Sequence, residues 1–520
     1  MTYRPRTSRR GRVLAAVLAG VGIAACSPSE HPGHSRDEGA SAPPTTAALA
    51  QRLVERMGGI DALNGVETLV GRGSGMRTRI GQIRIAGGED WTLRVEQTET
   101  IDLANGRAAF EYTISNDQFN MQRTEVYTSF EGQPIGWNTG PGRPQIATSP
   151  NGLFSWATQN SPQMLLRRNV ITVALAAAAT ASDQPAVEKE IGGRASLHGT
   201  ARLPSGEEIG LYFDPESGLL NAYTALDTEP MLGDVVAEYL LDDWRPVGNV
   251  TLPHSVTIRK EGRPFSSLTY ESISVNDASA LSIFEVPAAA LEQARQVVST
   301  EGSWSPLTLN EVAPGVYHAV GYSHHGMVVE FPSFVAVVEA AYTEVQGETL
   351  VRAIGERFGK PIRYVIPSHP HWDHTGALRR LVAAGATAIL AAGHEVELRA
   401  VIEAPHTNPP DELARRRAAG ERVGGIEVFT GERVIEEGDR RLELYEVSGI
   451  PHVEPKVLAY VPHAGAIFQS DIFFGAPSPD ATALYEAIRE RGLEVRSIVD
   501  GHGGVVPFET LEAAARSSIQ

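Results

Sequence analysis

Cysteine is almost absent from this chain of 520 residues, which contains only Cys26. A single cysteine excludes a disulfide within the chain, and we exclude thiolate metal ligands as well. Positive charge is also scarce, because 45 Lys and Arg stand against 63 Asp and Glu, which gives a formal net charge of −18. Binding to nucleic acid phosphates requires basic patches, so this balance argues against a nucleic acid partner.

The N-terminal apolar run is too short for a comfortable membrane span. The run VLAAVLAGVGIAA covers residues 13–25, and five arginines and no acidic residue precede it. A basic start, a short apolar run and small residues at its end are typical of a secretory signal. We therefore predict that residues 1–25 are a signal peptide and that the protein is exported.

The signal ends at the only cysteine. The sequence IAAC resembles the bacterial lipobox, which implies that Cys26 becomes the lipidated first residue of the mature chain. We therefore expect an anchored protein of the periplasm or outer membrane, whose only membrane contact is through Cys26. An ordinary signal peptide with a chance cysteine is the alternative.

The composition changes twice along the rest of the chain. Residues 26–45 are rich in Ser, Pro, Gly and charge, and predict a flexible linker. Residues 46–303 contain short β-branched and aromatic runs separated by Gly, Asn, Asp and Pro, among them QIRIAGG at 82–88. This pattern predicts a mostly antiparallel β domain of the α+β class. Helical spacing predicts helices within 46–66 and 169–181.

The strand and turn order of the β domain resembles the periplasmic lipoprotein-carrier fold, up to the Phe-x-x-Pro sequence at Phe284 to Pro287. The resemblance implies a curved antiparallel sheet closed over a helix. It also implies that this domain could carry a hydrophobic ligand. An unrelated β sandwich is the alternative.

Residues 304–520 have a different pattern, in which buried strands alternate with amphipathic helices. GETLVRAIGERFG, GALRRLVAAG and TALYEAIRERG predict helices, while IRYVIPSH, AIFQSD and VRSIVDGH predict strands. The alternation predicts a layered α/β domain. No Gly-x-Ser-x-Gly, phosphate-binding or dinucleotide-binding motif stands out in it.

The segment SHPHWDHTG crowds His369, His371, Asp373 and His374 into six positions after a predicted strand. Pro370 forbids an ordinary helix through His369, so we expect an extended segment that turns into a helix at Thr375. Imidazole nitrogens and carboxylate oxygens are zinc ligands, and a carboxylate can bridge two ions. The segment therefore predicts a metal site at a strand end.

His-x-His-x-Asp-His resembles the signature of the metallo-β-lactamase superfamily. The resemblance implies an αββα sandwich, and it implies further ligands at later strand ends, where His452, Asp471 and His502 stand. Carried over residue by residue, it implies two groups of ligands and one bridging residue. The first metal would have His369, His371 and His452, the second Asp373, His374 and His502, and Asp471 would bridge them.

Two positions depart from relatives of this superfamily. Glu339 stands where many relatives carry a supporting Asp, and we expect it to keep a supporting role. Asp471 stands where zinc β-lactamases usually carry Cys or Ser, which favours the glyoxalase II, lactonase and general hydrolase branches. His324 and His325 either line the cleft or pack in the core.

The resemblance implies a hydrolase with two divalent metal ions, zinc first, with iron or manganese as alternatives. A metal-bridging hydroxide would attack an ester, lactone, thioester or amide bond of a small molecule, with Asp373 orienting the nucleophile and moving a proton. An iron-dependent sulfur dioxygenase is the alternative enzyme. A protein that binds lipid or another hydrophobic ligand in its β domain is the alternative outside enzymes.

Overall fold

The computed structural model describes residues 43–116, 120–139, 145–147, 162–299, 307–321 and 324–518. The predicted signal peptide, Cys26, most of the predicted linker and the predicted boundary at 303/304 lie outside these residues. Within them, no helix has the length and apolarity needed to cross a membrane.

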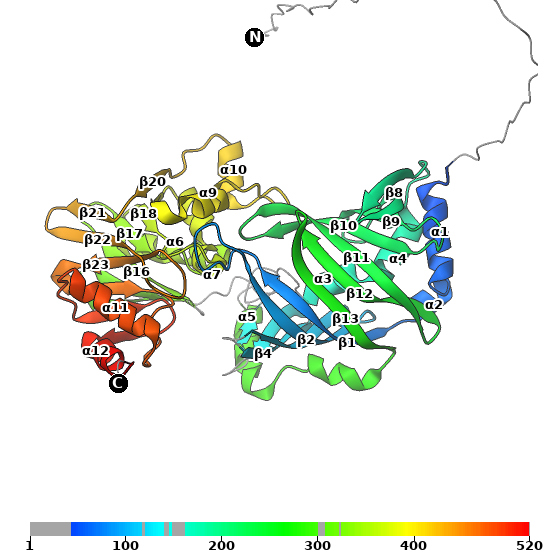
Figure 1. Ribbon diagram of the computed structural model, residues 1–520, viewed down its shortest axis with the longest axis horizontal. Coiled ribbons are helices and arrows are strands. Elements are labelled where there is room, and N and C mark those ends of the chain that lie inside the picture. The colour runs from blue at the N-terminus through cyan, green and yellow to red at the C-terminus, as the bar shows by residue number, and fades with distance from the viewer. Residues whose placement is uncertain are drawn as a thin grey trace, which may run out of the picture. The chain divides into compact units, whose positions relative to one another are not determined.

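A single antiparallel sheet dominates the N-terminal part (Figure 1). Its order is β6-β5-β4-β3-β2-β1-β13-β12-β11-β10-β9-β8-β7. The strands are β1 Thr68–Arg79, β2 Trp91–Asp102, β3 Arg107–Ser115, β4 Asn120–Phe130, β5 Gln133–Thr139, β6 Gln145–Ala147, β7 Val187–Ile191, β8 Arg194–Arg202, β9 Glu208–Phe213, β10 Leu220–Glu229, β11 Gly233–Val247, β12 Val250–Lys260 and β13 Arg263–Val275. The predicted antiparallel β domain is confirmed.

The helices of this part are α1 Thr46–Arg56, α2 Ile60–Asn64, α3 Pro162–Arg168, α4 Val170–Thr180 and α5 Leu291–Ser299. They confirm the helical segments predicted within 46–66 and 169–181. Asn169 caps α4 by accepting a hydrogen bond from the Thr172 amide, and Ile171 and Val173 are buried. The alanine-rich helix is therefore part of the core, as its composition indicated.

One predicted strand is wrong. The segment QIRIAGG at 82–88 is not a strand but lies in the connection between β1 and β2. Arg79 and Trp91 are the last paired residues on either side of it. Ile83 is buried although it has no place in the sheet, because the connection packs against another part of the molecule, described below.

The C-terminal part contains two sheets. The first has the order β14-β15-β16-β17-β18-β19-β20 and the second β21-β22-β23-β24-β25-β26. The strands are β14 Thr308–Ala313, β15 Val316–Val320, β16 His325–Glu330, β17 Val335–Val338, β18 Ile362–Ile366, β19 Thr387–Ala391, β20 Ile426–Phe429, β21 Glu432–Glu437, β22 Arg440–Val447, β23 Lys456–Val461, β24 Ala466–Gln469, β25 Ser497–Asp500 and β26 Val505–Pro507.

Three hydrophobic clusters order these sheets into layers. One cluster joins buried residues of both sheets, such as Val338 and Phe468. A second joins the β22–β25 face with the last two long helices, which Figure 1 shows together on that sheet. A third includes residues of the helices beside the first sheet. The layer order is therefore helix, sheet, sheet, helix, as expected.

The helices of the C-terminal part are α6 Glu344–Phe358, α7 Trp372–Thr375, α8 Leu378–Ala383, α9 Glu395–Glu403, α10 Glu412–Ala418, α11 Pro479–Glu490 and α12 Phe508–Ser518.

Candidate metal centre

The candidate ligands stand directly after strands of both sheets. Glu339 follows β17, and His369 and His371 lie between β18 and α7. Asp471 follows β24, and His502 follows β25. Since β17 and β18 are parallel neighbours, as are β24 and β25, their carboxyl ends open at the same edge of each sheet. The helix after the motif begins at Trp372, three residues earlier than predicted.

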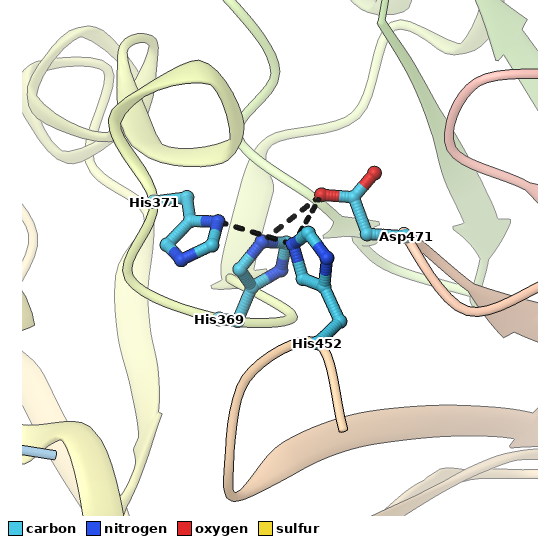
Figure 2. A group of neighbouring side chains, drawn as sticks. All are labelled: His369, His371, His452 and Asp471. Carbon is cyan, nitrogen blue, oxygen red and sulfur yellow. Dashed lines mark hydrogen bonds and ion pairs between the residues drawn. The ribbon is translucent and has the colours of Figure 1, made fainter. Parts of the chain in front are cut away.

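Asp471 is the centre of the cluster. Its Oδ2 lies 3.4 Å from His369 Nε2, 3.0 Å from His374 Nε2 and 3.1 Å from His452 Nε2. Its Oδ1 lies 2.6 Å from His502 Nε2. Figure 2 shows the rings of His369 and His452 turned toward this carboxylate. One carboxylate therefore joins histidines of both ligand groups implied by the sequence.

His371 completes the first group. Its Nδ1 lies 3.3 Å from His452 Nε2, and His369, His371, His452 and Asp471 each offer one ligand atom within a common 4.8 Å (Figure 2). All four side chains are buried or half-buried. These are the three histidines that the sequence implies around the first metal, together with Asp471.

The second group contains an addition. His374 and His502 lie together with His324, again within 4.8 Å. His324 is buried, and its Nε2 lies 3.3 Å from Asp373 Oδ2. Asp373 Oδ2 lies 3.9 Å from His374 Nε2. The structure thus brings Asp373, His374 and His502 together, and it places His324 beside them and not in a distant core.

Glu339 supports two of the histidines. Its Oε2 accepts a hydrogen bond from Ser368 Oγ at 2.6 Å, and Ser368 Oγ lies 2.8 Å from His369 Nδ1. Because the hydroxyl proton goes to Glu339, His369 Nδ1 is the donor to Ser368, and its Nε2 lone pair faces Asp471. Glu339 Oε2 also lies 3.3 Å from His374 Nδ1, which leaves His374 Nε2 facing the cluster. Glu339 therefore lies within reach of two predicted ligands, and its supporting role stays a prediction.

The local backbone is strained at these positions. Glu339 has a φ of 80° and Asp471 a φ of 58°, the left-handed region that side chains other than glycine rarely adopt. Such residues concentrate at functional sites, where the surrounding structure holds them in place. Here the strain turns both carboxylates back toward the histidines.

The electrostatics of the cluster favour a cation. Burial lowers the pKa of His369 and His371 well below the usual value, so both imidazoles are neutral, the form that binds metals. Burial also lowers the pKa of His374, but the carboxylates of Asp471 and Asp373 outweigh it and raise the pKa to about 10. Burial raises the pKa of Asp471, yet the charge of His374 opposes burial and helps to bring this pKa well below its usual range. Buried negative charge is thus balanced here by a proton on an imidazole.

The residues fit divalent metal ions. Buried His369 Nε2 and His374 Nε2 have no hydrogen bond of good geometry among the described residues, although both face the carboxylate. Unsatisfied buried nitrogens beside a charged carboxylate are costly unless a ligand satisfies them. The donor set of imidazoles and carboxylates is the one that zinc prefers in the absence of thiolates.

Lys456 also lies in this site, although it was not predicted from the sequence. It opens β23, in which every residue is buried, and its Nζ donates to Ser470 O at 2.7 Å and lies 3.3 Å from His369 Nδ1. Burial lowers its pKa to about 8. A lysine that begins a wholly apolar strand close to His452 was the signal in the sequence that could have identified it.

The comparisons with known proteins concern the C-terminal part. Residues 343–491 match the model of the Metallo-beta-lactamase superfamily, a range that contains six of the predicted ligands but neither His502 nor Glu339. No curated protein matches the chain.

Several solved structures resemble the chain, each over about two fifths of its length. A metallo-β-lactamase from Pontibacter korlensis is 14% identical, with a TM-score of 0.33, over 41% of this chain and 99% of that one. One from Hirschia baltica is 17% identical, with a TM-score of 0.31, over 41% and 98%. FIM-1 from Pseudomonas aeruginosa in the mono-zinc form is 17% identical, with a TM-score of 0.31, over 41% and 95%.

The family match does not extend to the N-terminal sheet, so the resemblance of that sheet to a lipoprotein-carrier fold stays a prediction. The match lies within the two-sheet part, which carries helices on its outer faces and the histidine cluster at the strand ends. The C-terminal part of the chain has the metallo-β-lactamase fold.

Proposed function

We propose that the chain is a metal-dependent hydrolase that holds two divalent ions, zinc first, and cleaves an ester, lactone, thioester or amide bond of a small molecule. The observation that carries this proposal is the position of Asp471, whose two oxygens face four histidines from two ligand groups. A carboxylate shared in this way suits a pair of cations better than one. Divalent ions in such a site act as Lewis acids and lower the pKa of water.

The chain's own side chains prepare the site for this chemistry. Asp373 Oδ1 is occupied by a hydrogen bond from Gln82 Nε2 at 2.8 Å, so Oδ2 is the oxygen left to orient the nucleophile and to take up or release a proton. Lys456 holds a positive charge behind His369 and anchors the carbonyl of Ser470, next to Asp471. These contacts fix the ligands before substrate arrives, which reduces reorganisation during the reaction.

Apolar side chains at the rim favour a substrate with an apolar portion. Phe474 is 64% exposed, and its ring centre lies 6.0 Å from that of His502. On the other side, the ring of Trp91 lies 6.0 Å from His371 and 5.9 Å from His452. An exposed aromatic beside a polar cluster is a typical recognition element for small molecules.

The test is metal quantification on the purified protein combined with a screen of lactone, thioester, ester, amide, β-lactam and phosphodiester substrates. We expect about two ions per chain and hydrolysis of a carbonyl substrate without oxygen uptake. Bound iron with substrate-dependent oxygen uptake would replace the hydrolase by the dioxygenase alternative. Metal-free protein without hydrolysis would overturn the proposal.

A cavity in the N-terminal part favours a second role, the binding of a hydrophobic ligand. Its lining comes from β1–β3, β10–β13 and the α3–α4 segment, and is mostly apolar, with Val95, Phe110, Leu252, Val256 and Leu268 among its side chains. Strands β3 and β10 are six positions apart in the sheet order and line one cavity, so the sheet curves around it. Mostly apolar cavities that contain a few polar groups are typical ligand sites.

Filling the cavity tests this role. Val256→Trp should weaken the binding of a fluorescent fatty acid at least about fivefold, since an indole would occupy the space that the ligand needs. The control is Val236→Trp, at an exposed position of β11. Equal binding by both variants and the unmodified protein would argue against a ligand in this cavity.

We also propose export with lipidation of Cys26, on the sequence pattern alone.

A further inference from the structure

The connection between β1 and β2 is longer than the strands require. Arg79 and Trp91 are directly paired, so a turn of two residues could join them, yet residues 80–90 intervene. The connection is ordered by its own hydrogen bonds. The Gly81 amide donates to Asp90 Oδ1 at 2.8 Å, and the Trp91 amide donates to Gln82 O at 2.9 Å. Residues 80–90 thus form a structured loop that extends from the N-terminal sheet to the metal centre.

Gln82 contacts the second ligand group. Its side chain is 3% exposed, and its Nε2 donates to Asp373 Oδ1 at 2.8 Å. The other oxygen of Asp373 faces His324 and His374. A carboxylate that accepts a hydrogen bond on one oxygen is held in one rotamer, so Gln82 directs Asp373 Oδ2 into the cluster.

Ile83 contacts the first ligand group through its backbone. Its carbonyl oxygen lies 2.8 Å from His371 Nε2, and since a carbonyl can only accept, His371 Nε2 must carry the proton. The unprotonated Nδ1 then faces His452. A hydrogen bond from the distal nitrogen to a carbonyl is the usual way in which a protein fixes the tautomer and the ring plane of a metal-binding histidine.

We propose that residues 80–90 are a positioning segment of the metal centre, in which Gln82 orients Asp373 and the Ile83 carbonyl orients His371. Two further bonds fasten the segment, from the Glu454 amide to Arg84 O and from the Gly87 amide to Glu397 Oε1, both at 2.8 Å. Neighbouring residues of one segment thus support one ligand in each group. The N-terminal sheet is therefore part of the catalytic unit.

The inference rests on the proposed function in one respect, which is that the cluster binds metal. It does not depend on which bond is cleaved. The orientation of a ligand affects affinity and ligand field directly, so both can be measured without substrate.

The experiment compares Gln82→Met with the unmodified chain. The control is Gln122→Met, the same substitution at an exposed position of β4 in the same sheet. Methionine keeps the length of the side chain but cannot donate to Asp373. We expect Gln82→Met to weaken binding of one Zn²⁺ ion by about 10- to 100-fold in competition with a chromophoric chelator. In the Co²⁺-loaded protein its visible absorption bands should shift, while Gln122→Met should retain both properties.

A second variant removes both contacts. Residues 80–90 are replaced by Asn-Gly, which closes a two-residue turn between Arg79 and Trp91. Circular dichroism and thermal unfolding establish that each variant is folded. We expect the shortened variant to lose affinity for both ions.

The outcomes separate this inference from the proposed function. Unchanged Zn²⁺ affinity and Co²⁺ spectra in folded Gln82→Met and in the shortened variant would overturn the positioning role while hydrolysis by the unmodified chain stood. Altered affinity and spectra in a chain that hydrolyses nothing would uphold the positioning role and sink the proposed function. An unmodified chain that binds no metal would overturn both.

Discussion

Asp373 and Asp471 at the metal centre differ from Glu125, a buried carboxylate of the N-terminal sheet. In the N-terminal sheet, Glu125 is 2% exposed and accepts a hydrogen bond from Tyr112 at 2.7 Å, and burial raises its pKa. In the C-terminal part, burial likewise opposes the charge of Asp373 and Asp471, yet neighbouring histidines bring the pKa of both well below the usual range. Glu125 is paired with a neutral hydroxyl group. Asp373 and Asp471 instead stay charged, and the desolvation cost of a buried charge is offset only by nearby cations.

The same contrast applies to buried cations. Lys260 of the N-terminal sheet lies 3.0 Å from the carboxylate of Asp227, so the charge is paired locally. Lys456 donates to a backbone carbonyl and faces a histidine, and burial lowers its pKa to about 8. Several titratable side chains with shifted pKa values lie around Asp471 and do not form separate ion pairs. Such a cluster is typical of a functional site.

The largest expected effect is that of Asp471→Ala. This variant removes the carboxylate that faces four histidines, so metal content should fall to one ion or none, and hydrolysis should fall by more than about 1000-fold. His502→Ala removes a ligand from one group only, and should retain one ion and some activity. Glu125→Gln, the corresponding change in the N-terminal sheet, should leave both quantities unaltered. Metal-to-protein ratios decide, and a fully loaded, active Asp471→Ala would refute the central place of this residue.

Glu339→Gln should have the next largest effect. The amide of Gln keeps only one uncharged acceptor oxygen, so the hydrogen bonds from Ser368 and His374 weaken and both His369 and His374 are held less firmly. Zn²⁺ affinity should fall by about 10- to 100-fold, measured by chelator competition. Ser333→Ala, which removes an exposed hydroxyl bonded to Glu437, is the control. Retained affinity in Glu339→Gln would reduce Glu339 to a packing role.

Metal removal should destabilise one part of the molecule selectively. At a free metal concentration of 100 times the dissociation constant, binding stabilises the folded state by about 2.7 kcal/mol. Hydrogen exchange resolved by segment should therefore accelerate in β18, α7 and β24 after treatment with EDTA, and should change little in β8 and β9. Uniform acceleration throughout the chain would show that the N-terminal sheet depends on the metal as much as the C-terminal sheets do.

Metal binding should release a proton from His374 but not from His324. Although burial lowers the pKa of both, the carboxylates around His374 raise its value to about 10, while that of His324 stays at about 4. At pH 8 the metal-free protein therefore holds a proton on His374, which binding must displace, and none on His324. Calorimetry in buffers of different ionisation enthalpy should count about one proton per chain from this residue. Absence of proton release at pH 8 would contradict the raised value.

Cys26→Ser should have the smallest effect on the purified protein. Cys26 is not one of the proposed metal ligands, so we expect metal content and hydrolysis to stay unchanged. In cells, the variant should move from the membrane fraction to the soluble fraction, because the lipid anchor is lost. Retention in the membrane after a salt wash would contradict lipidation.

Local patterns in the sequence were sufficient to predict most elements and the ligand types. The Pro-interrupted motif, with its histidines in six positions, identified the site, because strand ends in layered α/β folds concentrate polar groups at one edge. Alternation of apolar residues predicted the antiparallel strands of the N-terminal part, since one face of each strand is buried.

Only the tertiary structure decided how these pieces meet. Gln82 and Ile83 had the composition of a strand, and nothing local distinguishes a paired Ile-x-Ile from one that packs against a site 288 residues away. His324 could equally have packed in a distant core until the fold placed it beside Asp373. A sequence determines which groups can bind a metal, because that is a property of each side chain. Which groups orient them depends on contacts between distant segments, which the periodicity of one segment cannot encode.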